Sequence, residues 1–387
     1  MPVTLPSFNK HIDIVCFSLS RWDAAISSPA ASLAREFSKN NRVFFIEHPY
    51  SYKDYFSEKK SYRQYTDGNV RVVTPPLVYP INFLPEGNLY NKLSSYNNSI
   101  LLKTLRKIIK ENSIHEYLFI NFFDPFFLRS IPEDINPVKF IYQCMDDISQ
   151  VEYTRRHGTR LENDIIKNAD VVLCTSRELT KIKSSLSSNV HFHPNAADVE
   201  LFTTAATQVL KKPEGMRFGD RKIIGFTGSI EYRTDFELLY KTAVHHHDKI
   251  IYMVGPVTGD EHIKLGLTEL HNVIFAGARQ LHELPAYLQY FDCCIIPYKV
   301  NKLTSSIYPL KINEYLAAGK PVVATHFSED IYSFRDHAYI ADTHEAFIAA
   351  IDKSIVENTV NKKLARIQAA GANSWKKRVD EFWEMII

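Results

Sequence analysis

The sequence predicts an α/β protein with two doubly wound parallel-sheet domains. Its 387 residues exceed what one hydrophobic core ordinarily holds. Apolar runs of strand length alternate with amphipathic helical segments from Ile12 onward, and a second series of this kind begins at Ile223 after a polar stretch. Such alternation indicates parallel sheets, because parallel strands need a crossover segment, usually a helix, to join them.

The first domain is predicted to open with a β-α-β unit. Residues 12–19 form a buried strand, residues 29–40 a helix and residues 43–47 the next strand. Residues 48–98 are rich in Tyr, Asn and Pro and are predicted to be irregular. Further strands are predicted at 117–121, 139–143, 171–174 and 190–193, and helices at 101–111 and 160–168.

The second domain follows a polar linker that we place at residues 203–220, which contain Pro213 and Gly215. Its first strand begins at Ile223, and further strands are predicted at 249–254, 273–276, 293–297 and 322–325. The predicted divisions are 1–205 for the first domain, 206–365 for the second, and 366–387 for a terminal helix that carries Trp375, Phe382 and Trp383.

The bulk properties narrow the class of protein. A formal net charge of +2 gives no reason to expect nucleic acid as a partner. The five cysteines show no paired metal-ligand spacing, so we expect buried reduced thiols rather than disulfides. Residues 1–10 lack an apolar stretch of signal-peptide length, and no window has the length of a membrane-spanning helix. We therefore expect a cytoplasmic protein.

Residues 303–325 carry the strongest functional signal. A polar loop leads to Pro309, and a short amphipathic helix is predicted at 310–318. Gly319 ends this helix, and Pro321 follows just before the next apolar strand.

The first turn of this helix contains Lys311 and Glu314, which lie three residues apart and therefore share one face. Backbone N–H groups at a helix N-terminus suit phosphate, and the Lys311 ammonium adds a full positive charge. Glu314 is placed to accept hydrogen bonds from ribose hydroxyls, so the pattern suits a nucleotide diphosphate. An exposed Lys/Glu pair on an ordinary helix is the alternative.

This segment resembles the donor-binding segment of nucleotide-sugar glycosyltransferases with the GT-B fold, in particular bacterial enzymes of the teichuronic-acid type and the xanthan glucuronosyltransferase type. The stretches that carry the resemblance are 301–304, 309–311, 314–323, 142–149, 168–176 and 194–198. The resemblance covers most of the chain from about Ile141 onward. It implies two Rossmann-like domains that face across a cleft, with the nucleotide sugar on the second, the acceptor on the first, and a last helix that crosses back to the first.

Other candidate donor contacts lie near the predicted carboxyl ends of second-domain strands. Gly228 lets the backbone approach a phosphate closely, although many turns after a strand carry glycine. The resemblance implies that Arg279 contacts the nucleotide base, and an exposed loop arginine is the alternative. Tyr298 either contacts the nucleotide or packs beneath the next loop. The remaining candidates are Ser229, Ser305, Ser306, Pro309 and Leu310; Ser305 and Ser306 are either phosphate donors or plain loop hydroxyls.

The sequence favours an inverting, metal-independent transfer. The resemblance implies that a retaining enzyme carries a second Glu eight residues before Glu314, and this chain has Ser306 there. Lys311 would then neutralise the leaving diphosphate without a covalent step. The chain has no Asp-x-Asp triplet, and the run 245–247 of three histidines has no carboxylate or cysteine at ligand spacing, so we expect a solvated loop there.

An inverting transfer needs a base for the acceptor hydroxyl. Asp146 and Asp147 follow the strand at 139–143, and we prefer Asp147 slightly. Adjacent carboxylates disfavour each other's ionised form, which suits a base, but an Asp pair also suits the cap of the next helix. Asp23 and the Glu47-His48 pair are further candidates, and they would otherwise order the acceptor loops.

We therefore expect a glycosyltransferase that moves a sugar, from a uridine diphosphate donor, to a cell-surface polysaccharide or lipid-linked glycan, with no further cofactor. The aromatic residues 77–85 and the basic helix after them suit an anionic membrane surface. A core-packed helix with a solvated basic face is the alternative. Two rival functions are a nucleotide-sugar 2-epimerase and a catalytically inactive glycosyltransferase-like subunit that binds a partner enzyme.

Overall fold

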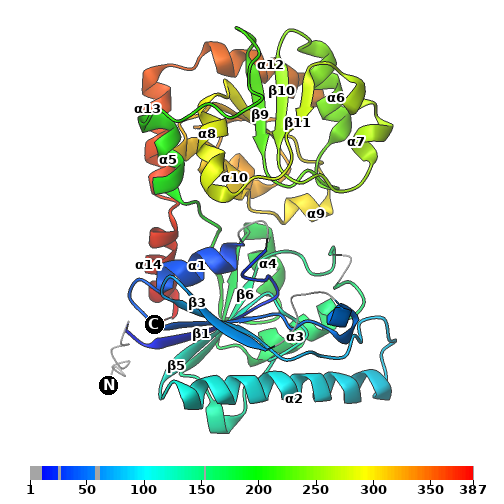
Figure 1. Ribbon diagram of the computed structural model, residues 1–387, viewed down its shortest axis with the longest axis vertical. Helices are drawn as coiled ribbons and strands as arrows, with labels where there is room; N and C mark the ends of the chain where they lie inside the picture. The colour runs from blue at the N-terminus through cyan, green and yellow to red at the C-terminus, as the bar shows by residue number, and fades with distance from the viewer. Residues whose placement is uncertain (1–10, 25–27, 57–61, 152–153, 387) are drawn as a thin grey trace. The chain divides into compact units, whose positions relative to one another are not determined.

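The computed structural model describes residues 11–24, 28–56, 62–151 and 154–386. The chain forms two compact units, one of Met1–Pro194 with Arg378–Ile387 and one of Asn195–Lys377. Each unit contains a sheet with helices packed around it (Figure 1). The units divide at 194/195 and 377/378, whereas the sequence places the divisions at 205/206 and 365/366.

The first unit contains one sheet of eight described strands in the order β3-β4-β2-β1-β5-β6-β7-β8. Every neighbouring pair is parallel except β3 with β4. The strands are β1 (Asp13–Ser18), β2 (Val43–Glu47), β3 (Arg63–Asp67), β4 (Val70–Thr74), β5 (Tyr117–Phe122), β6 (Lys139–Cys144), β7 (Val171–Cys174) and β8 (Val190–Phe192).

The β3–β4 hairpin lies within residues 48–98, so the prediction that this stretch is irregular is wrong. Strand β3 stands at the edge of the sheet and exposes most of its side chains. Its polar composition therefore lacks the apolar run that reveals a buried strand.

Helix α2 (Asn88–Glu111) is twice as long as the predicted helix at 101–111. Its first half is rich in Asn and Ser, which have low helix propensity. Asn97 is fully buried in that half, and its amide bonds both the N–H and the carbonyl of Tyr79, at 3.0 and 2.9 Å. Tertiary packing thus sustains a helix that local propensity does not predict.

Helices pack on both faces of the first sheet. Val15 and Phe17 of β1 share one buried cluster with Leu105 of α2 and Ile165 of α3. The intervening strand residues point to the opposite face, on which α1 packs. The remaining helices of this unit are α1 (Pro29–Phe37), α3 (Gly158–Asn168) and α4 (Arg177–Lys183), with 3-10 turns η1 (Tyr52–Phe56) and η2 (Glu133–Ile135).

The last helix of the chain, α14 (Trp375–Ile386), adds its final residues to the first unit. The ring of Phe382 lies 4.8 Å from that of Phe37 in α1, measured between centroids. The Lys139 ammonium donates to the Ile386 carbonyl at 2.5 Å. These contacts fix the carboxyl end of the described chain on this unit.

The second unit contains a six-stranded parallel sheet in the order β11-β10-β9-β12-β13-β14. Its strands are β9 (Ile223–Thr227), β10 (Ile250–Val254), β11 (Val273–Phe275), β12 (Cys293–Ile296), β13 (Val322–Thr325) and β14 (Tyr339–Ala341). Its helices are α5 (Val199–Thr207), α6 (Phe236–His245), α7 (Glu261–Lys264), α8 (Leu284–Gln289), α9 (Lys302–Ser305), α10 (Leu310–Ala317), α11 (Glu329–Tyr332), α12 (His344–Val356) and α13 (Val360–Gly371), with 3-10 turns η3 (Leu267–Glu269) and η4 (Leu281–Glu283).

The segment that we predicted as a linker, residues 203–220, lies within the second unit and begins inside α5. Helix α5 packs on α8, α10 and α13. The first and last residues of this unit also meet. Ala197 and Ser374 form a parallel bridge, and the Ala197 N–H donates to the Asn373 carbonyl at 3.1 Å.

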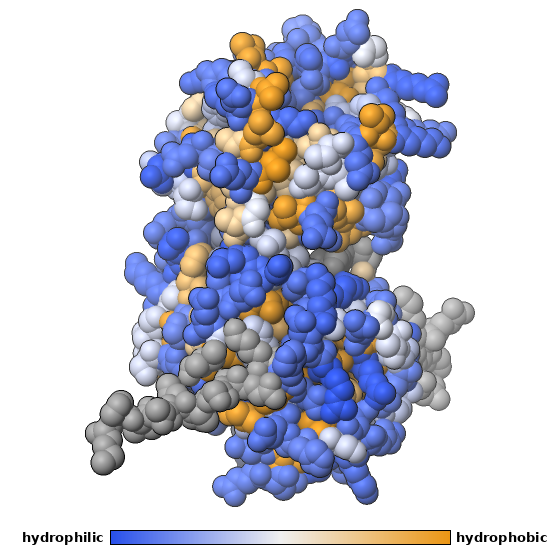
Figure 2. Space-filling model, turned by 90° about the vertical axis from the view of Figure 1, so that its left-hand side faces the viewer, coloured by the Kyte–Doolittle hydropathy of each residue, from blue (hydrophilic) through white to orange (hydrophobic). Residues whose placement is uncertain are grey.

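The five cysteines are free and buried, as predicted. Burial raises the pKa of the Cys293 thiol to about 12. No helix among the described residues is long and apolar enough to cross a bilayer. One face of the molecule carries hydrophilic side chains between separate apolar patches (Figure 2).

Candidate functional site

The sheet of the second unit reverses its direction of growth between β9 and β12. Strands β10 and β11 extend it on one side of β9, and β12, β13 and β14 extend it on the other. Ligands of open parallel sheets bind outside the carboxyl ends of the strands at such a point. Gly228 directly follows β9 and Tyr298 follows β12, so predicted donor residues gather at this edge.

Lys311 of α10 lies across Gly228. A Cβ atom added to Gly228 would overlap Cε and Nζ of Lys311, and the φ angle of Gly228 is +133°, which favours glycine. The ammonium lies 5.9 Å from the ring centroid of Phe226. None of the ion pairs formed by the described residues involves this ammonium. An unpaired positive charge therefore stands at the loop that follows β9.

Glu314 lies one turn further along α10 and is 5% exposed. Its Oε2 atom is buried and has no hydrogen-bond partner among the described residues. Burial raises the pKa of this carboxyl group, and the charge of nearby Lys311 opposes the increase. Leaving a buried oxygen unpaired is costly, and hydroxyl groups of a ligand would satisfy it. The alternative of an exposed Lys/Glu pair therefore does not describe Glu314.

The start of α10 is capped by backbone carbonyls and by no side chain. Pro309 occupies the N-cap position, and no side chain caps the helix. Leu310 is the first helical residue, as the sequence predicted. The Leu310 N–H donates to the Tyr308 carbonyl at 3.0 Å and the Ile312 N–H donates to the Pro309 carbonyl at 3.1 Å. These two N–H groups are therefore already used, and the attraction for an anion at this helix start comes mainly from the Lys311 charge.

Gly255, which the sequence analysis did not single out, supports the same loop. It directly follows β10, and a Cβ atom there would overlap the carbonyl group of Gly228. The Gly228 N–H donates to the Val254 carbonyl at 2.7 Å, and the Gly255 N–H donates to the Gly277 carbonyl at 2.9 Å. A glycine immediately after the apolar run 250–254 was the available signal.

Arg279 and Tyr298 occupy different environments. Nε of Arg279 donates to the Tyr287 hydroxyl at 2.6 Å, which places the partly exposed guanidinium on the loop after β11. Tyr298 is 7% exposed, and its ring lies 5.1 Å from that of Phe327 between centroids. The packing alternative thus describes the ring of Tyr298.

The hydroxyl groups of Ser305 and Ser306 donate within α9. They bond the carbonyls of Lys302 and Leu303, both at 2.9 Å. Ser306 is also 1% exposed. The plain loop-hydroxyl alternative describes both serines in this arrangement. Ser229, next to Gly228, is half-buried.

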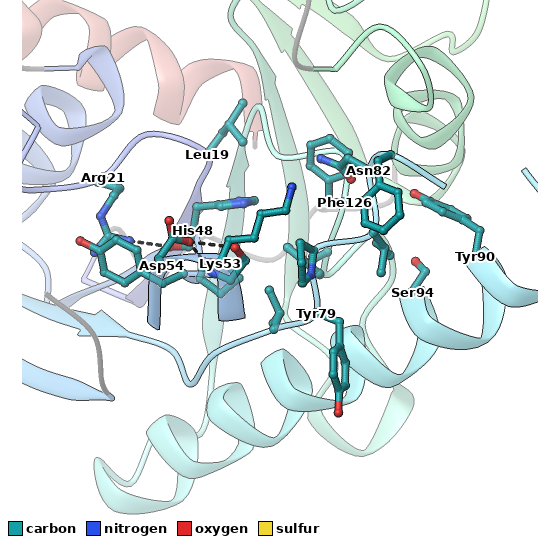
Figure 3. A pocket seen from close by; sticks show the side chains of 18 residues that line it. Leu19, Arg21, His48, Lys53, Asp54, Tyr79, Asn82, Tyr90, Ser94 and Phe126 are labelled. Atoms are coloured by element: carbon teal, nitrogen blue, oxygen red, sulfur yellow. Dashed lines mark hydrogen bonds between the residues drawn. The ribbon is translucent and has the colours of Figure 1, made fainter. Parts of the chain in front are cut away.

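The first unit contains a cavity of about 490 Å³. Its wall comes from loops after β1, β2, β4 and β5 and from α2, so it also lies at carboxyl ends of strands. Several Tyr and Phe side chains contribute to the wall, and Figure 3 shows Lys53 extending into the open space. The lining includes Arg21, His48, Tyr50, Lys53, Asp54, Tyr79, Asn82, Phe83, Tyr90, Phe126 and Phe127.

A histidine-carboxylate pair forms part of this wall. Nδ1 of His48 lies 2.6 Å from Oδ2 of Asp124, and Asp124 is fully buried. His48 was a candidate from the sequence, whereas Asp124 was not. Its signal was weak, because one Asp after the apolar run 117–123 resembles an ordinary loop residue.

The other reserve candidates are already engaged. The buried carboxylate of Glu47 accepts from Arg21 Nη2 at 3.1 Å, from the Trp22 N–H at 2.9 Å and from the Thr74 hydroxyl at 2.5 Å. Asp23 pairs with Arg63 at 3.0 Å and with Arg21 at 3.5 Å. Both carboxylates therefore act as structural acceptors here.

Asp147 closes a local turn. Its Oδ1 accepts from the backbone N–H of Ser149 at 3.0 Å and from the Ser149 hydroxyl at 2.7 Å. Asp147 does not cap the next helix, α3, whose N-cap residue is His157, so the helix-capping alternative does not describe it. Asp146 beside it is half-buried. Neither residue belongs to the lining of the cavity.

The histidine run differs from the predicted solvated loop. His245 ends α6, and His246 is 1% exposed. His245, His246 and Asp352 place one potential ligand atom each within 4.8 Å of one another. The Lys249 ammonium, however, lies 3.1 Å from Asp352, where it competes with a cation for this carboxylate. This cluster lies outside the edge that holds Lys311.

Comparisons with known proteins agree with this architecture. Residues 221–356 match the family "Glycosyl transferases group 1". The chain is 31% identical over 220 residues to the "Putative teichuronic acid biosynthesis glycosyltransferase TuaH" of Bacillus subtilis (strain 168). That match covers 54% of each protein, so this chain spans about half the length of the curated relative. The resemblance to teichuronic-acid-type enzymes is thereby confirmed.

Solved structures resemble nearly the whole chain. A sucrose-phosphate synthase from Thermosynechococcus elongatus has a TM-score of 0.70 at 15% identity, with 97% of this chain and 98% of that one covered. Anabaena Alr3699/HepE in complex with UDP has a TM-score of 0.63 at 13% identity, with 97% and 99% covered. At these identities the likeness establishes the fold, and the prediction of the GT-B fold is confirmed.

Proposed function

We propose that this chain, whose second unit contains a Glycosyl transferases group 1 domain, is a glycosyltransferase. It moves a sugar from a nucleotide diphosphate donor to a glycan or lipid-linked oligosaccharide of the cell surface. The observation that carries this proposal is the unpaired Lys311 ammonium across Gly228, one turn from the unpartnered carboxylate oxygen of Glu314. A diphosphate and a ribose hydroxyl would satisfy both groups together.

The donor binds the second unit in this proposal. Lys311 binds the diphosphate at the start of α10, and Glu314 accepts hydrogen bonds from the ribose. Arg279 contacts the base from the loop after β11. A uridine base is supported by HepE, which was solved in complex with UDP.

The chemical step is an inverting displacement that needs no metal ion. The Lys311 charge stabilises the diphosphate as the bond to the sugar breaks, which is electrostatic catalysis without a covalent intermediate. Ser306 stands where a retaining enzyme would carry Glu, and its hydroxyl is bonded within α9. Retention is the competing outcome, and a trehalose-6-phosphate synthase of this fold has been studied for transfer with retention.

The acceptor binds the cavity of the first unit. Its aromatic wall offers flat apolar faces to sugar rings, while Lys53 offers a cation to an acidic or phosphorylated acceptor. TuaH is named for teichuronic acid biosynthesis, which supports a cell-surface polysaccharide as the product.

We further propose that this unit meets the membrane surface that carries such acceptors. Tyr79, Phe83 and Tyr96 are 44%, 60% and 53% exposed, although large apolar side chains are ordinarily buried. The rings of Tyr79 and Tyr96 lie 5.6 Å apart between centroids, and Tyr79 and Phe83 also line the cavity. Exposed aromatic side chains beside lysines suit a lipid interface.

Calorimetric titration with UDP, followed by incubation with labelled UDP-sugars and a lipid-linked oligosaccharide, tests the proposal. We expect UDP to bind and the label to reach the acceptor, and NMR of the product to show an inverted anomeric carbon. An isomerised free donor would indicate a 2-epimerase instead. Absence of nucleotide binding would indicate an inactive partner subunit.

A further inference from the structure

Four hydrogen bonds hold Asp124 in place, two made by its backbone and two accepted by its carboxylate. The Asn121 amide bonds both the N–H and the carbonyl of Asp124, at 2.9 and 3.0 Å. Oδ1 of Asp124 accepts from the N–H groups of Phe126 and Phe127, at 2.8 and 3.3 Å. Oδ2 remains for His48, so the loop presents one fixed oxygen to the imidazole.

The loop that carries Asp124 is strained. Phe123 has φ = +62° although it is an aromatic residue, and Leu128 has φ = +49°. Residues other than Gly, Asn and Asp rarely adopt this left-handed backbone conformation. They do so where the surrounding structure enforces it. Strain on both sides of a fully buried carboxylate indicates a functional constraint on that carboxylate.

The imidazole of His48 is oriented by this carboxylate and by aromatic neighbours. Its ring centroid lies 5.5 Å from that of Phe127 and 6.2 Å from that of Phe126. In the neutral ring, Nδ1–H donates to Asp124, which leaves Nε2 with a free lone pair. No hydrogen bond among the described residues involves Nε2, and His48 forms part of the cavity wall shown in Figure 3.

We propose that His48 is the general base of the reaction and that Asp124 is its positioning residue. The inference rests on the proposed glycosyltransferase function. Nε2 takes the proton of the acceptor hydroxyl, and the acceptor oxygen forms a bond to the anomeric carbon. The bond between that carbon and the diphosphate breaks, and its electron pair leaves with the diphosphate. Asp124 stabilises the imidazolium, as in other carboxylate-histidine pairs.

His48 fits this role better than Asp147. Oδ1 of Asp147 already accepts two hydrogen bonds from Ser149, and Asp147 does not line the cavity. The Nε2 atom of His48, by contrast, has no described partner. The base is thus placed on the loop after β2 rather than on the loop after β6.

The experiment compares His48→Gln, Asp124→Asn and Asp147→Asn with the wild-type full chain. The donor is a UDP-sugar, the acceptor a lipid-linked oligosaccharide, and kcat, KM and UDP affinity are measured across pH. His48→Gln places a non-basic amide near the position of Nε2 and so removes the basic nitrogen. His191→Gln is the control, because His191 of β8 bonds only Asn189 among the contacts described.

We expect His48→Gln to lower kcat roughly 10²- to 10⁴-fold, with UDP affinity unchanged. The wild-type rate should fall in acid as Nε2 is protonated, and the residual rate of His48→Gln should lack that acid limb. The charged groups around the ring that shape this limb are Asp124 after β5, Arg21 after β1, and Lys53 and Asp54 after β2. Asp124→Asn should lower kcat roughly tenfold or more, because it permits the wrong tautomer.

Two results would overturn the assignment. Wild-type-like kcat in His48→Gln would remove His48 from the chemistry, and a large loss confined to Asp147→Asn would move the base to Asp147. Failure of the wild type to bind UDP or to turn over any UDP-sugar would instead refute the proposed function itself. ¹⁵N NMR of the imidazole adds a readout without substrate: we expect the Nδ1–H tautomer in the wild type, and the Nε2–H tautomer there would also contradict the role.

Discussion

Lys311 occupies the space that a side chain on Gly228 would fill. The two residues are distant in sequence, one following β9 and the other in the first turn of α10. Only a glycine at 228 lets the aliphatic end of Lys311 cross the loop and deliver its ammonium there. The loop and the helix are therefore coupled, and the coupling can be tested from either side.

Replacing Gly228 with Ala should displace the Lys311 ammonium. The new methyl group overlaps Cε and Nζ, and φ of +133° is unfavourable for Ala. We expect weaker UDP binding by calorimetry and a stability loss of about 1–3 kcal/mol. Gly371→Ala is the matched control, because nothing lies within 4 Å of its added Cβ. Equal UDP affinity in both variants would contradict the coupling.

Replacing Lys311 with Ala should abolish transfer and leave the fold intact. Losing one charge that stabilises a leaving group typically costs roughly a hundredfold in rate or more. Circular dichroism should be unchanged, because the ammonium forms no ion pair in the described chain. Undiminished turnover of a UDP-sugar would show that Lys311 has no part in the reaction.

Replacing Glu314 with Gln should weaken nucleotide binding while raising stability at neutral pH. Burial raises the pKa of this carboxyl, so the native state binds its proton more tightly than the unfolded chain does. Stability therefore falls as pH rises above the unfolded value near 4.5, and Gln removes that loss.

The nucleotide readout for Glu314 compares UDP with its 2′-deoxy and 3′-deoxy analogues. The wild type should lose roughly tenfold in affinity for at least one analogue, because a hydrogen bond to a charged group is lost. Glu314→Gln should discriminate less between UDP and that analogue. Glu237→Gln on the exposed face of α6 serves as control. Equal discrimination in the wild type and Glu314→Gln would disconnect Glu314 from the ribose.

The first unit should lose stability in mild acid through His193. This fully buried ring bonds the Arg378 carbonyl through Nε2 at 2.9 Å, and burial lowers its pKa from 6.5 to about 4. The unfolded chain thus binds the proton more readily, so stability is full above pH 6.5 and falls between 6.5 and about 4. The total loss is on the order of 3 kcal/mol.

Urea unfolding followed by tryptophan fluorescence at pH 7.5 and pH 5 measures this loss. His193→Gln cannot titrate, and it should show a smaller difference between the two pH values. His191→Gln, on the neighbouring strand surface, should behave like the wild type. If His193→Gln keeps the full difference, other groups set the acid sensitivity.

Vesicle binding tests the exposed aromatic side chains. Vesicles of phosphatidylcholine with phosphatidylglycerol should sediment the wild type, and the double variant Phe83→Ser, Tyr96→Ser should bind roughly tenfold more weakly. Val209→Ser in the second unit is the control, since Val209 is 99% exposed but stands away from these aromatics in sequence. Equal sedimentation of all three proteins would exclude these rings as a lipid contact.

The parallel sheets could be predicted from the sequence because buried strands appear in it as apolar runs. The sequence could not predict β3, whose exposed edge carries polar residues, or the first half of α2, where the buried amide of Asn97 replaces local propensity. Capping and end signals located α10 closely, since Pro309 and Gly319 act through local backbone geometry.

In the candidate site, too, local features could be predicted from the sequence, whereas contacts between distant segments could not. Lys311 and Glu314 could be paired from their spacing on one helix, but the contact of Lys311 with Gly228 depends on how two distant segments pack. Asp124 could not be chosen from sequence, because its importance lies in the ring of His48, 76 residues away. Tyr298, Ser305 and Ser306 have the ring and the hydroxyl groups that we expected to contact a ligand. In the structure the ring packs on Phe327, and the two serine hydroxyls donate to backbone carbonyls.

The bridge between Ala197 and Ser374 joins the beginning and the end of the chain segment that forms the second unit. That unit is thus an insertion whose first and last residues lie side by side. Its removal would interrupt the chain at one place and would leave the first sheet, β1–β8, complete. A fragment of residues 195–377 should therefore fold alone and bind the nucleotide. A chain that ends before Phe382, by contrast, would lose the ring that packs on Phe37 in the first unit.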